Sequence, residues 1–264
     1  MSLRYSVLAS GSTGNATYIR TENTRLLIDA GLSGKQLEEL LRIIGEDPKE
    51  LDGILVTHEH VDHIKGLGVL ARRYKIPVYA NRKTWVELDK LCGAINREQK
   101  FTIEREEILL IGDIEVEAYG VSHDAVEPMA FCFYHGGKKI GMATDLGYVS
   151  ERIKGTLRDS DVLIFEANHD VDMLRMSHYP WNVKRRILSD LGHLSNEAAG
   201  EALADIVNER TKKIFLSHLS QDNNLQDLAR MTVEQILAAR DIEVGKSLTL
   251  HDTFPDRPTK LVAV

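Results

Sequence analysis

Residues 53–66 read Gly-Ile-Leu-Val-Thr-His-Glu-His-Val-Asp-His-Ile-Lys-Gly and carry the strongest structural signal in the sequence. The first four residues form an apolar run typical of a buried strand. The run is followed, within six positions, by His58, His60, Asp62 and His63. Side chains two positions apart on an extended chain point to the same side, so His58 and His60 are expected to converge. Where the chain turns into a helix near residue 64, Asp62 and His63 are expected to reach a second point nearby.

Imidazoles and a carboxylate in this arrangement are suitable ligands for Zn²⁺, Mn²⁺ or Fe. The pattern therefore predicts a metal site at a sheet edge, where the strand ends. Two such ions about 3.5–4 Å apart can clamp both the attacking and the leaving oxygen of a displacement reaction. The alternative is a solvated histidine-rich turn, which the density of ligand-type side chains at a strand end disfavours.

Length and composition indicate an ordinary globular protein. The chain has 264 residues, of which 43% are hydrophobic and 28% charged, and no apolar run is long enough for a transmembrane helix, so we expect no membrane partner. Cys92 and Cys132 are too few for a disulfide framework, and the N-terminal apolar stretch is too short for a secretory signal, so a cytoplasmic location is expected. Without repeats or linkers, we expect a single domain over residues 1–264, with a short helical lid around residues 167–195. No pattern indicates the oligomeric state.

Short apolar runs alternate with amphipathic segments along the chain. The expected strands are residues 5–9, 17–20, 25–28, 53–56, 78–80, 114–121, 130–134, 139–143, 162–165 and 214–216. The expected helices are residues 33–44, 64–74, 83–91, 181–191, 196–208 and 225–239. Ser33 and Ser195 are expected N-caps. Gly112-Asp113 and Gly136-Gly137 predict hairpin turns, so mixed sheets in a layered α/β fold are expected.

The motif His58-x-His60-x-Asp62-His63 resembles the signature of the metallo-β-lactamase-fold hydrolases. Three segments, residues 9–15 (Ala-Ser-Gly-Ser-Thr-Gly-Asn), residues 27–31 (Leu-Ile-Asp-Ala-Gly) and residues 57–66, together resemble the YycJ (WalJ) branch of that superfamily over essentially the whole chain. The resemblance implies a four-layer αββα sandwich, with two mixed sheets, helices outside and the metal site at one sheet edge. It also implies two divalent metal ions (Zn, Mn or Fe) and 5′-to-3′ exonuclease activity on double-stranded DNA.

The family pattern implies three further ligands, His123, Asp145 and His218. Each follows a strand-like run, where loops at one sheet edge can converge. His123 would complete the site of the first two motif histidines, His218 would complete that of the last two motif residues, and Asp145 would bridge both ions. A hydrogen-bonded loop role for His123 and a turn-capping role for Asp145 are the alternatives.

Two residues resemble those that nuclease branches of the superfamily place around the leaving group. His193, in Gly-His-Leu-Ser ahead of an expected helix, is expected to donate a proton to the departing oxygen. Glu166, at the end of a buried strand, is expected to hold His193 in its productive tautomer. Asp62 is expected both to bind metal and to orient the attacking hydroxide. The alternative for His193 is a helix-entry histidine bonded to backbone, and Glu166 has a structural role as its alternative.

Lys184, Arg185 and Arg186 form the clearest basic cluster in the sequence. They are expected to bind phosphates that flank the scissile bond, with a solvated helix face as the alternative. Ser12 and Asn15, with the glycines around them, form either a turn whose amides face the cleft or a tight hairpin. The sequence does not separate these two interpretations.

The predicted cluster of ions and aspartates carries net positive charge, so it attracts an anion although the chain has a net charge of −7. The leading hypothesis is a dinuclear phosphodiesterase acting on nucleic acid, with linear duplex DNA implied by the resemblance. One alternative is hydrolysis of a small phosphodiester or cyclic nucleotide, which predicts that the basic cluster is turned away from the cleft. Another is a metal-bound regulatory module that binds a partner without turnover. β-Lactam hydrolysis fits poorly, because the Asp62/His63 site is complete and no secretory signal is expected.

Overall fold

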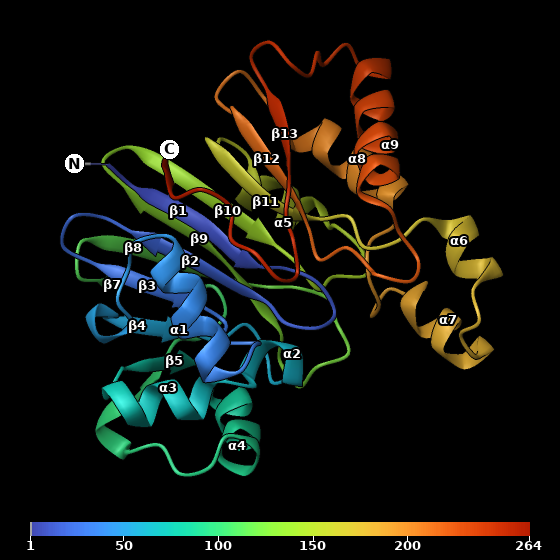
Figure 1. Ribbon diagram of the computed structural model, residues 1–264. Coiled ribbons are helices and arrows are strands. Elements are labelled where there is room, and N and C mark those ends of the chain that lie inside the picture. The colour runs from blue at the N-terminus through green and yellow to red at the C-terminus, as the bar shows by residue number, and fades with distance from the viewer. Residues whose placement is uncertain (1) are drawn as a thin grey trace. The chain divides into compact units, whose positions relative to one another are not determined.

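The computed structural model describes residues 2–264, which form two compact units (Figure 1). Unit 1 comprises the residues up to 120 together with residues 125–138 and 254–264, and unit 2 comprises residues 121–124 and 139–253. That the units form a single domain, as the sequence predicts, stays a prediction. Among residues 2–264, no helix has the length and apolar character needed to cross a membrane.

Unit 1 contains a mixed sheet with the strand order β14-β1-β2-β3-β4-β5-β6. Its strands are β1 (Arg4–Ala9), β2 (Ala16–Arg20), β3 (Arg25–Ile28), β4 (Gly53–Leu55), β5 (Val78–Ala80), β6 (Lys100–Thr102) and β14 (Val262–Ala263). Strands β14 to β3 pair antiparallel and strands β3 to β6 pair parallel. Because parallel strands end at the same edge of a sheet, the segments after β3 and β4 lie side by side.

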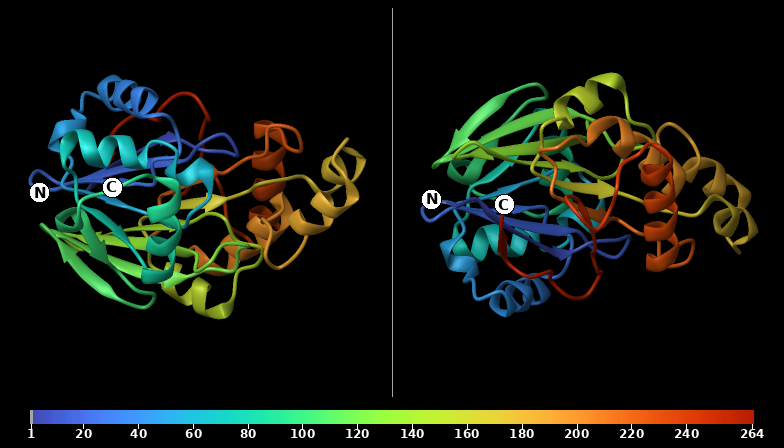
Figure 2. Two further views of the ribbon diagram at one scale, coloured as in Figure 1. Left: turned by 90° about the horizontal axis from the view of Figure 1, so that it is seen from below. Right: turned by 90° about the horizontal axis from the view of Figure 1, so that it is seen from above.

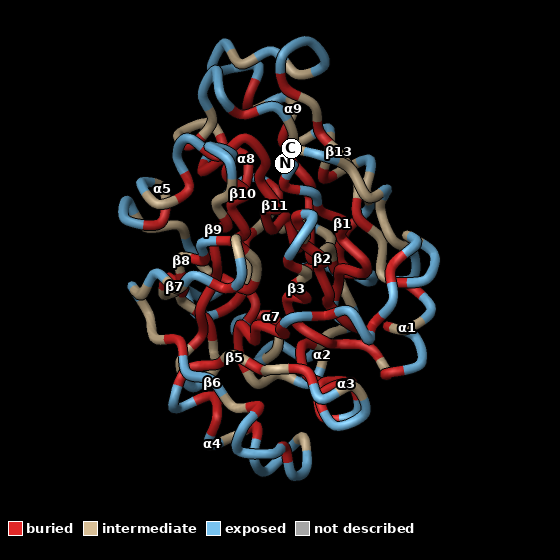
Figure 3. The backbone as a smooth tube through the Cα atoms, turned by 90° about the vertical axis from the view of Figure 1, so that its left-hand side faces the viewer, coloured by how far each residue is buried: buried red, intermediate tan, exposed pale blue. Residues whose placement is uncertain are grey.

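Helices cover this sheet because their apolar stripes pack on it. They are α1 (Gly34–Ile43), α2 (Val61–Ile64), α3 (Leu67–Tyr74) and α4 (Arg82–Leu91), with 3₁₀ turns at Pro48–Glu50 and Arg97–Gln99. Leu37 of α1, Leu70 of α3 and Leu88 of α4 are fully buried in one core with strand residues such as Leu27. Figure 3 shows β1, β2 and β3 as buried stretches, whereas the helices alternate between buried and exposed.

An antiparallel set of three strands completes unit 1. It consists of β7 (Ile108–Ile111), β8 (Ile114–Gly120) and β9 (Met129–His135). The predicted turn at Gly112-Asp113 is confirmed, because Ile111 pairs with Ile114 and Gly112 has φ +59°. Gly136 and Gly137, at the second predicted turn, also have positive φ and follow β9.

Unit 2 is built on four parallel strands in the order β13-β12-β11-β10. The strands are β10 (Lys138–Ala143), β11 (Val162–Glu166), β12 (Lys213–Ser217) and β13 (Thr249–Asp252). The helices are α5 (Glu151–Leu157), α6 (Val171–Met176), α7 (Trp181–Ile187), α8 (Asn196–Ile206) and α9 (Gln226–Ala239). In all three views of Figures 1 and 2, α6 and α7 protrude beyond α8 and α9.

Most predicted elements exist, and the differences have local causes. The helix expected over residues 64–74 is broken at Gly66, where a Cβ would lie 2.4 Å from the carbonyl oxygen of Leu32. The helix expected over residues 181–191 ends at Ile187, whose carbonyl accepts from the N–H of His193. Ser33 and Ser195 are confirmed as N-caps. The elements not predicted are short: α5, α6, β6, β7, β13, β14 and the two 3₁₀ turns.

Candidate functional site

The histidine-rich motif lies directly beyond β4 in unit 1. His60 is the extended residue before α2, with φ −62° and ψ 146°, so the chain turns into the helix between the two halves of the motif. Nε2 of His58 and Nδ1 of His60 lie 3.0 Å apart. The structure thus brings these two rings together, as their spacing predicts.

The buried carboxylate of Asp29 orients the motif through hydrogen bonds to Thr57 and His63. Asp29 follows β3 with the left-handed φ of +60°. Its Oδ2 accepts from Nδ1 of His63 and from the hydroxyl of Thr57, both at 2.8 Å, and its Oδ1 accepts from the N–H of Thr57 at 2.9 Å. Since the Thr57 hydroxyl hydrogen is committed to Asp29, its oxygen accepts from Nδ1 of His58 at 3.0 Å. Both rings therefore carry their proton on Nδ1 and their lone pair on Nε2.

Asp62 is held by the turn that joins β1 to β2. The backbone N–H of Asn15 donates to the carbonyl oxygen of Asp62 at 2.8 Å, and its Nδ2 lies 3.3 Å from Asp62 Oδ2. The side chain of Asn15 also accepts from the N–H of Gly11 at 2.9 Å, which closes the turn. A Cβ on Gly31 would lie 1.7 Å from the carbonyl oxygen of Asp62, so only glycine fits there. The segment is therefore both a strand connection and a support for the motif.

The parallel strands of unit 2 deliver a second group to one sheet edge. Asp145 follows β10, Glu166 ends β11 and His218 follows β12. Asp145 and His218 both adopt left-handed backbone conformations, with φ +58° and +57°, which are unusual for residues with side chains and concentrate at functional sites. Oδ1 of Asp145 lies 3.4 Å from Nε2 of His218 and 3.9 Å from Nε2 of His123. Nδ1 of His123 donates to the carbonyl oxygen of Gly192 at 3.1 Å.

Glu166 is fully buried and orients two histidines at once. Its Oε1 accepts from Nδ1 of His193 at 2.6 Å and from Nδ1 of His218 at 3.2 Å. Its Oε2 accepts from the backbone N–H of Leu146 at 3.0 Å and from that of Leu194 at 3.5 Å. With Nδ1 of each ring donating to one carboxylate oxygen, Nε2 is the nitrogen that each ring offers to other groups.

Two pKa shifts support these protonation states. Burial alone would raise the pKa of Glu166, but the charge and hydrogen bond of His193, joined by those of His218, outweigh it and hold this pKa below its usual value. Burial lowers the pKa of His123 against the opposing charge of Asp145. Near neutral pH, Glu166 is therefore ionised and His123 is a neutral imidazole, the form that binds metal.

The donor atoms fit divalent metal ions. A tetrahedral ion with ligands at about 2.0–2.1 Å separates neighbouring ligand atoms by about 3.3 Å. Three facing pairs approach this value: His58 Nε2 with His60 Nδ1 at 3.0 Å, His63 Nε2 with Asp62 Oδ2 at 3.5 Å, and His218 Nε2 with Asp145 Oδ1 at 3.4 Å. In unit 2, ligand atoms of Asp145, Glu166, His193 and His218 all lie within 4.8 Å of one another.

The predicted substrate-binding residues occupy different environments. Lys184 is buried, and its Nζ donates to the carbonyl oxygens of Arg175 and Ser177, each at 2.7 Å, so this ammonium holds α6 against α7. Arg185 is exposed. Arg186 is exposed too and lies 3.0 Å from the carboxylate of Asp124. Ser12 is exposed, whereas Asn15 is buried in the turn described above.

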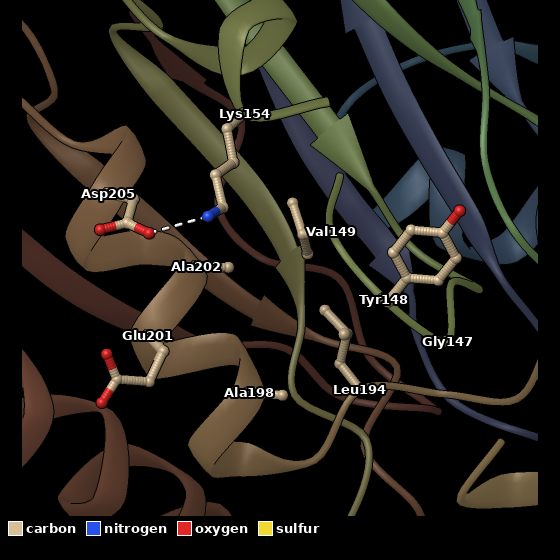
Figure 4. A pocket seen from close by; sticks show the side chains of 9 residues that line it. All are labelled: Gly147, Tyr148, Val149, Lys154, Leu194, Ala198, Glu201, Ala202 and Asp205. Carbon is tan, nitrogen blue, oxygen red and sulfur yellow. Dashed lines mark hydrogen bonds and ion pairs between the residues drawn. The ribbon is translucent and has the colours of Figure 1, made fainter. Parts of the chain in front are cut away.

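A groove of about 270 Å³ borders the unit 2 group (Figure 4). It is lined by residues next to the site, such as Gly147 and Leu194, and by small residues of α8. The ammonium of Lys154 lies 2.8 Å from the carboxylate of Asp205 within it. Because these charges neutralise each other, the groove offers no uncompensated positive charge to a phosphate.

Comparison with known proteins agrees with this geometry. A family model described as "Beta-lactamase superfamily domain" matches residues 24–219. A crystal structure of the metallo-β-lactamase fold protein YhfI from Bacillus subtilis superposes with a TM-score of 0.76 at 16% identity, covering 98% of this chain and 99% of that one. The chain belongs to the metallo-β-lactamase-fold superfamily, and it is a hydrolase. The expected fold class, an α/β sandwich of two mixed sheets with helices, is confirmed.

Within that superfamily, the chain is similar to two curated exodeoxyribonucleases. It is 53% identical over 261 residues to exodeoxyribonuclease YycJ of Bacillus anthracis, covering 99% of each chain. It is 49% identical over 263 residues to exodeoxyribonuclease WalJ of Streptococcus pneumoniae serotype 2, covering 99% of this chain and 98% of that one. The resemblance to the YycJ (WalJ) branch is confirmed.

Two positioning residues were not predicted. Asp29 holds His63 and Thr57, and the available signal was an aspartate at the end of a strand. Asn168 donates from Nδ2 to the carbonyl oxygen of His218 at 2.7 Å, which holds the loop after β12. No sequence spacing links Asn168 to His218, because their contact depends on the pairing of β11 with β12.

Proposed function

We propose that this chain is a metal-dependent exodeoxyribonuclease that removes nucleotides from the 5′ end of linear duplex DNA. The observation that carries the proposal is the Glu166–His193 pair beside Asp145 and His218. It supplies an oriented proton donor next to metal-type ligands, which hydrolysis of a phosphodiester requires. The choice of DNA is supported by the names of the two relatives that match over nearly the whole chain.

We assign seven side chains as ligands of two divalent ions, which are Zn²⁺, Mn²⁺ or Fe. The support is the ligand-like spacing within each unit and the chain's membership of the superfamily. When bound, the ions would bring the pKa of a water molecule close to neutrality and place positive charge beside the phosphate. The assigned ligands are His58, His60, Asp62, His63, His123, Asp145 and His218.

The protein's own groups then manage the protons. As the bond between phosphorus and the leaving oxygen breaks, Nε2 of protonated His193 gives its proton to that oxygen. Glu166 retains the Nδ1 hydrogen bond and stabilises the positive charge of the ring before transfer. Asp62, held by Asn15, accepts a hydrogen bond from the attacking water and orients it.

The exposed Arg185 and Arg186 are proposed to contact phosphates of the substrate. Ser12 and Asn15 are proposed to contact the substrate through backbone or side-chain groups. Lys184 supports these contacts through its hold on α6, because its ammonium already donates to two carbonyl oxygens. We also propose that residues 167–195 act as a lid and that the protein is cytoplasmic. The location is supported by the cysteine content, because Cys92 and Cys132 are too few for the disulfide framework typical of secreted proteins.

Two labelled duplexes test the substrate and the polarity. Protein loaded with Mn²⁺ or Zn²⁺ is given linear duplex DNA labelled at the 5′ or the 3′ strand end, with single-stranded DNA, RNA and a small phosphodiester in parallel. We expect the 5′ label to be released first, as a mononucleotide. The strand that carries the 3′ label should become shorter stepwise. Turnover of the small phosphodiester alone would refute the proposed nuclease activity. Binding of a substrate without turnover of any of them would indicate a regulatory module.

A further inference from the structure

The segment of α6 and α7 carries the two most exposed large apolar side chains of unit 2. Met176 is 81% exposed and Trp181 is 62% exposed. A tryptophan with most of its surface in water is unusual, because its ring is among the largest apolar groups a protein can bury. Figures 1 and 2 show this segment protruding from the rest of unit 2. The segment therefore offers an aromatic ring, of the kind enriched at interfaces, to a binding partner.

Hydrogen bonds hold the segment in place, although Met176 and Trp181 are exposed. Nζ of buried Lys184 donates to the carbonyl oxygens of Arg175 and Ser177, which ties α7 to the end of α6. The hydroxyl of Tyr179 donates to the carboxylate of Asp222 at 2.7 Å, which ties the intervening turn to the loop after β12. Trp181 is therefore presented on a braced support, which limits the ordering entropy lost when it binds a partner.

The exposed face of α7 combines the aromatic ring with positive charge. Arg185 lies four residues after Trp181, so the two side chains are neighbours on the helix surface. Arg186 is exposed on the same side of the helix axis as Asn182, while Lys184 and Ile187 form the buried face. Residues 181–187 contain no acidic side chain, although the whole chain has a net charge of −7. An anionic partner with a flat face is therefore favoured over an apolar one.

The same helix is joined directly to the proposed proton donor. The carbonyl oxygen of Ile187, its last residue, accepts from the backbone N–H of His193 at 3.0 Å. The side chain of Ser122, next to His123, donates to the carbonyl oxygen of Asp190 at 2.7 Å. A nucleic-acid strand bound to α7 would therefore contact the same segment of the protein that carries His193.

We propose that Trp181 stacks on a base of the nucleic-acid strand and that Arg185 binds the neighbouring phosphate. This inference rests on the proposed function, since it assumes a nucleic-acid substrate. Every base offers a face for stacking, so the contact grips the strand without selecting its sequence. An arginine beside an aromatic ring adds charge attraction to the phosphate backbone.

Intrinsic fluorescence tests the stacking directly. The chain has two tryptophans, and the other, Trp85, is 9% exposed with its Nε1 donating to the carbonyl oxygen of Phe101. In a Trp85→Phe variant, the emission comes from Trp181 alone. We expect a phosphorothioate-linked oligonucleotide, which resists hydrolysis, to quench this emission and to shield the ring from acrylamide. Unchanged emission at saturating oligonucleotide would overturn the inference.

Kinetics provide the second readout. In metal-loaded protein, Trp181→Ala should raise KM for the oligonucleotide by roughly 5- to 100-fold, while Trp181→Phe keeps most of the affinity. Bis(p-nitrophenyl) phosphate, which has no strand beyond its scissile bond, serves as reference, because general damage would impair both substrates equally. Leu110→Ala is the matched control, since Leu110 is 67% exposed on β7 in unit 1. It should leave both KM values unchanged.

The outcomes separate this inference from the proposed function. If the unaltered protein degrades DNA and Trp181→Ala keeps the same KM, stacking is refuted while the nuclease stands. If the unaltered protein degrades no nucleic acid, the proposed function fails and the stacking contact fails with it. Membrane vesicles or a protein partner that quench Trp181 where the oligonucleotide does not would also overturn the inference.

Discussion

Replacing Glu166 with glutamine should separate the orientation of the site from its packing. The backbone N–H groups of Leu146 and Leu194 donate to one oxygen of this carboxylate, so that position must remain an acceptor. The amide NH₂ of Glu166→Gln is therefore forced toward Nδ1 of His193 and His218. Both rings must then accept at Nδ1, which moves their proton to Nε2.

The size of the effect follows from this change of tautomer. The protonated form of His193 has no acceptor for Nδ1–H, so proton donation is lost, and kcat should fall by about 10²–10⁴-fold, equivalent to roughly 3–5 kcal/mol. His218 loses the lone pair that faces Asp145, so the affinity for metal should fall by about 10–100-fold. Stability should change little, because the substitution keeps the shape of a fully buried side chain.

The assay is single-turnover cleavage of 5′-labelled duplex at saturating metal, with bound metal measured separately by competition with a chelator. Glu201→Gln is the matched control, because Glu201 is exposed on α8 and is expected to tolerate the loss of charge. Turnover by Glu166→Gln within about threefold of the unaltered protein would refute the orienting role and, with it, the assignment of His193 as proton donor.

Three further predictions concern metal, backbone and pH. Asp29→Asn, which tolerates the left-handed φ at this position, should weaken metal binding by about 10–100-fold in chelator competition, and unaltered affinity would show that Asp29 does not tune His63. Gly31→Ala should lower the free energy of unfolding by at least about 2 kcal/mol or prevent folding. Gly155→Ala in α5, where a Cβ would meet open space, should raise the free energy of unfolding by about 0.5–1 kcal/mol. Burial lowers the pKa of His169 to about 4. Between pH 6.5 and 4 this histidine therefore binds a proton in the unfolded chain but not in the folded chain. The free energy of unfolding should fall by about 3 kcal/mol over that range. His169→Phe should flatten this part of a denaturation profile, and an unchanged slope would contradict the assignment.

The sequence predicts the elements of the site better than its supports. His58 and His60 meet because a strand places alternate side chains on one side, a rule that needs no tertiary information. Asp145 and His218 are implied as ligands by the family resemblance, and the local pattern adds only that each follows an apolar run, which the structure shows as the parallel strands β10 and β12.

The supports depend on pairings that no local pattern contains. Asp29 reaches Thr57 and His63 because β3 and β4 are parallel neighbours, which the sequence does not specify. Lys184 stands in a basic run that favours a solvated side chain, yet it is buried, and the end of α6 supplies the carbonyl oxygens of Arg175 and Ser177 as acceptors. The short strands β6, β7, β13 and β14 likewise form because a neighbouring strand is already in place.

The proposed metal-dependent release of 5′ nucleotides can be tested by returning metal to metal-free protein. Bound ions are counted while release of 5′ nucleotides from duplex DNA is followed. We predict no release without metal, two ions bound per chain at full occupancy, and activity that rises with filling of the sites. Asp145→Ala should bind less metal and release no nucleotides under the same conditions. Release of nucleotides by metal-free protein, or a fully loaded protein that leaves every DNA substrate intact, would contradict the proposed metal-dependent nuclease activity.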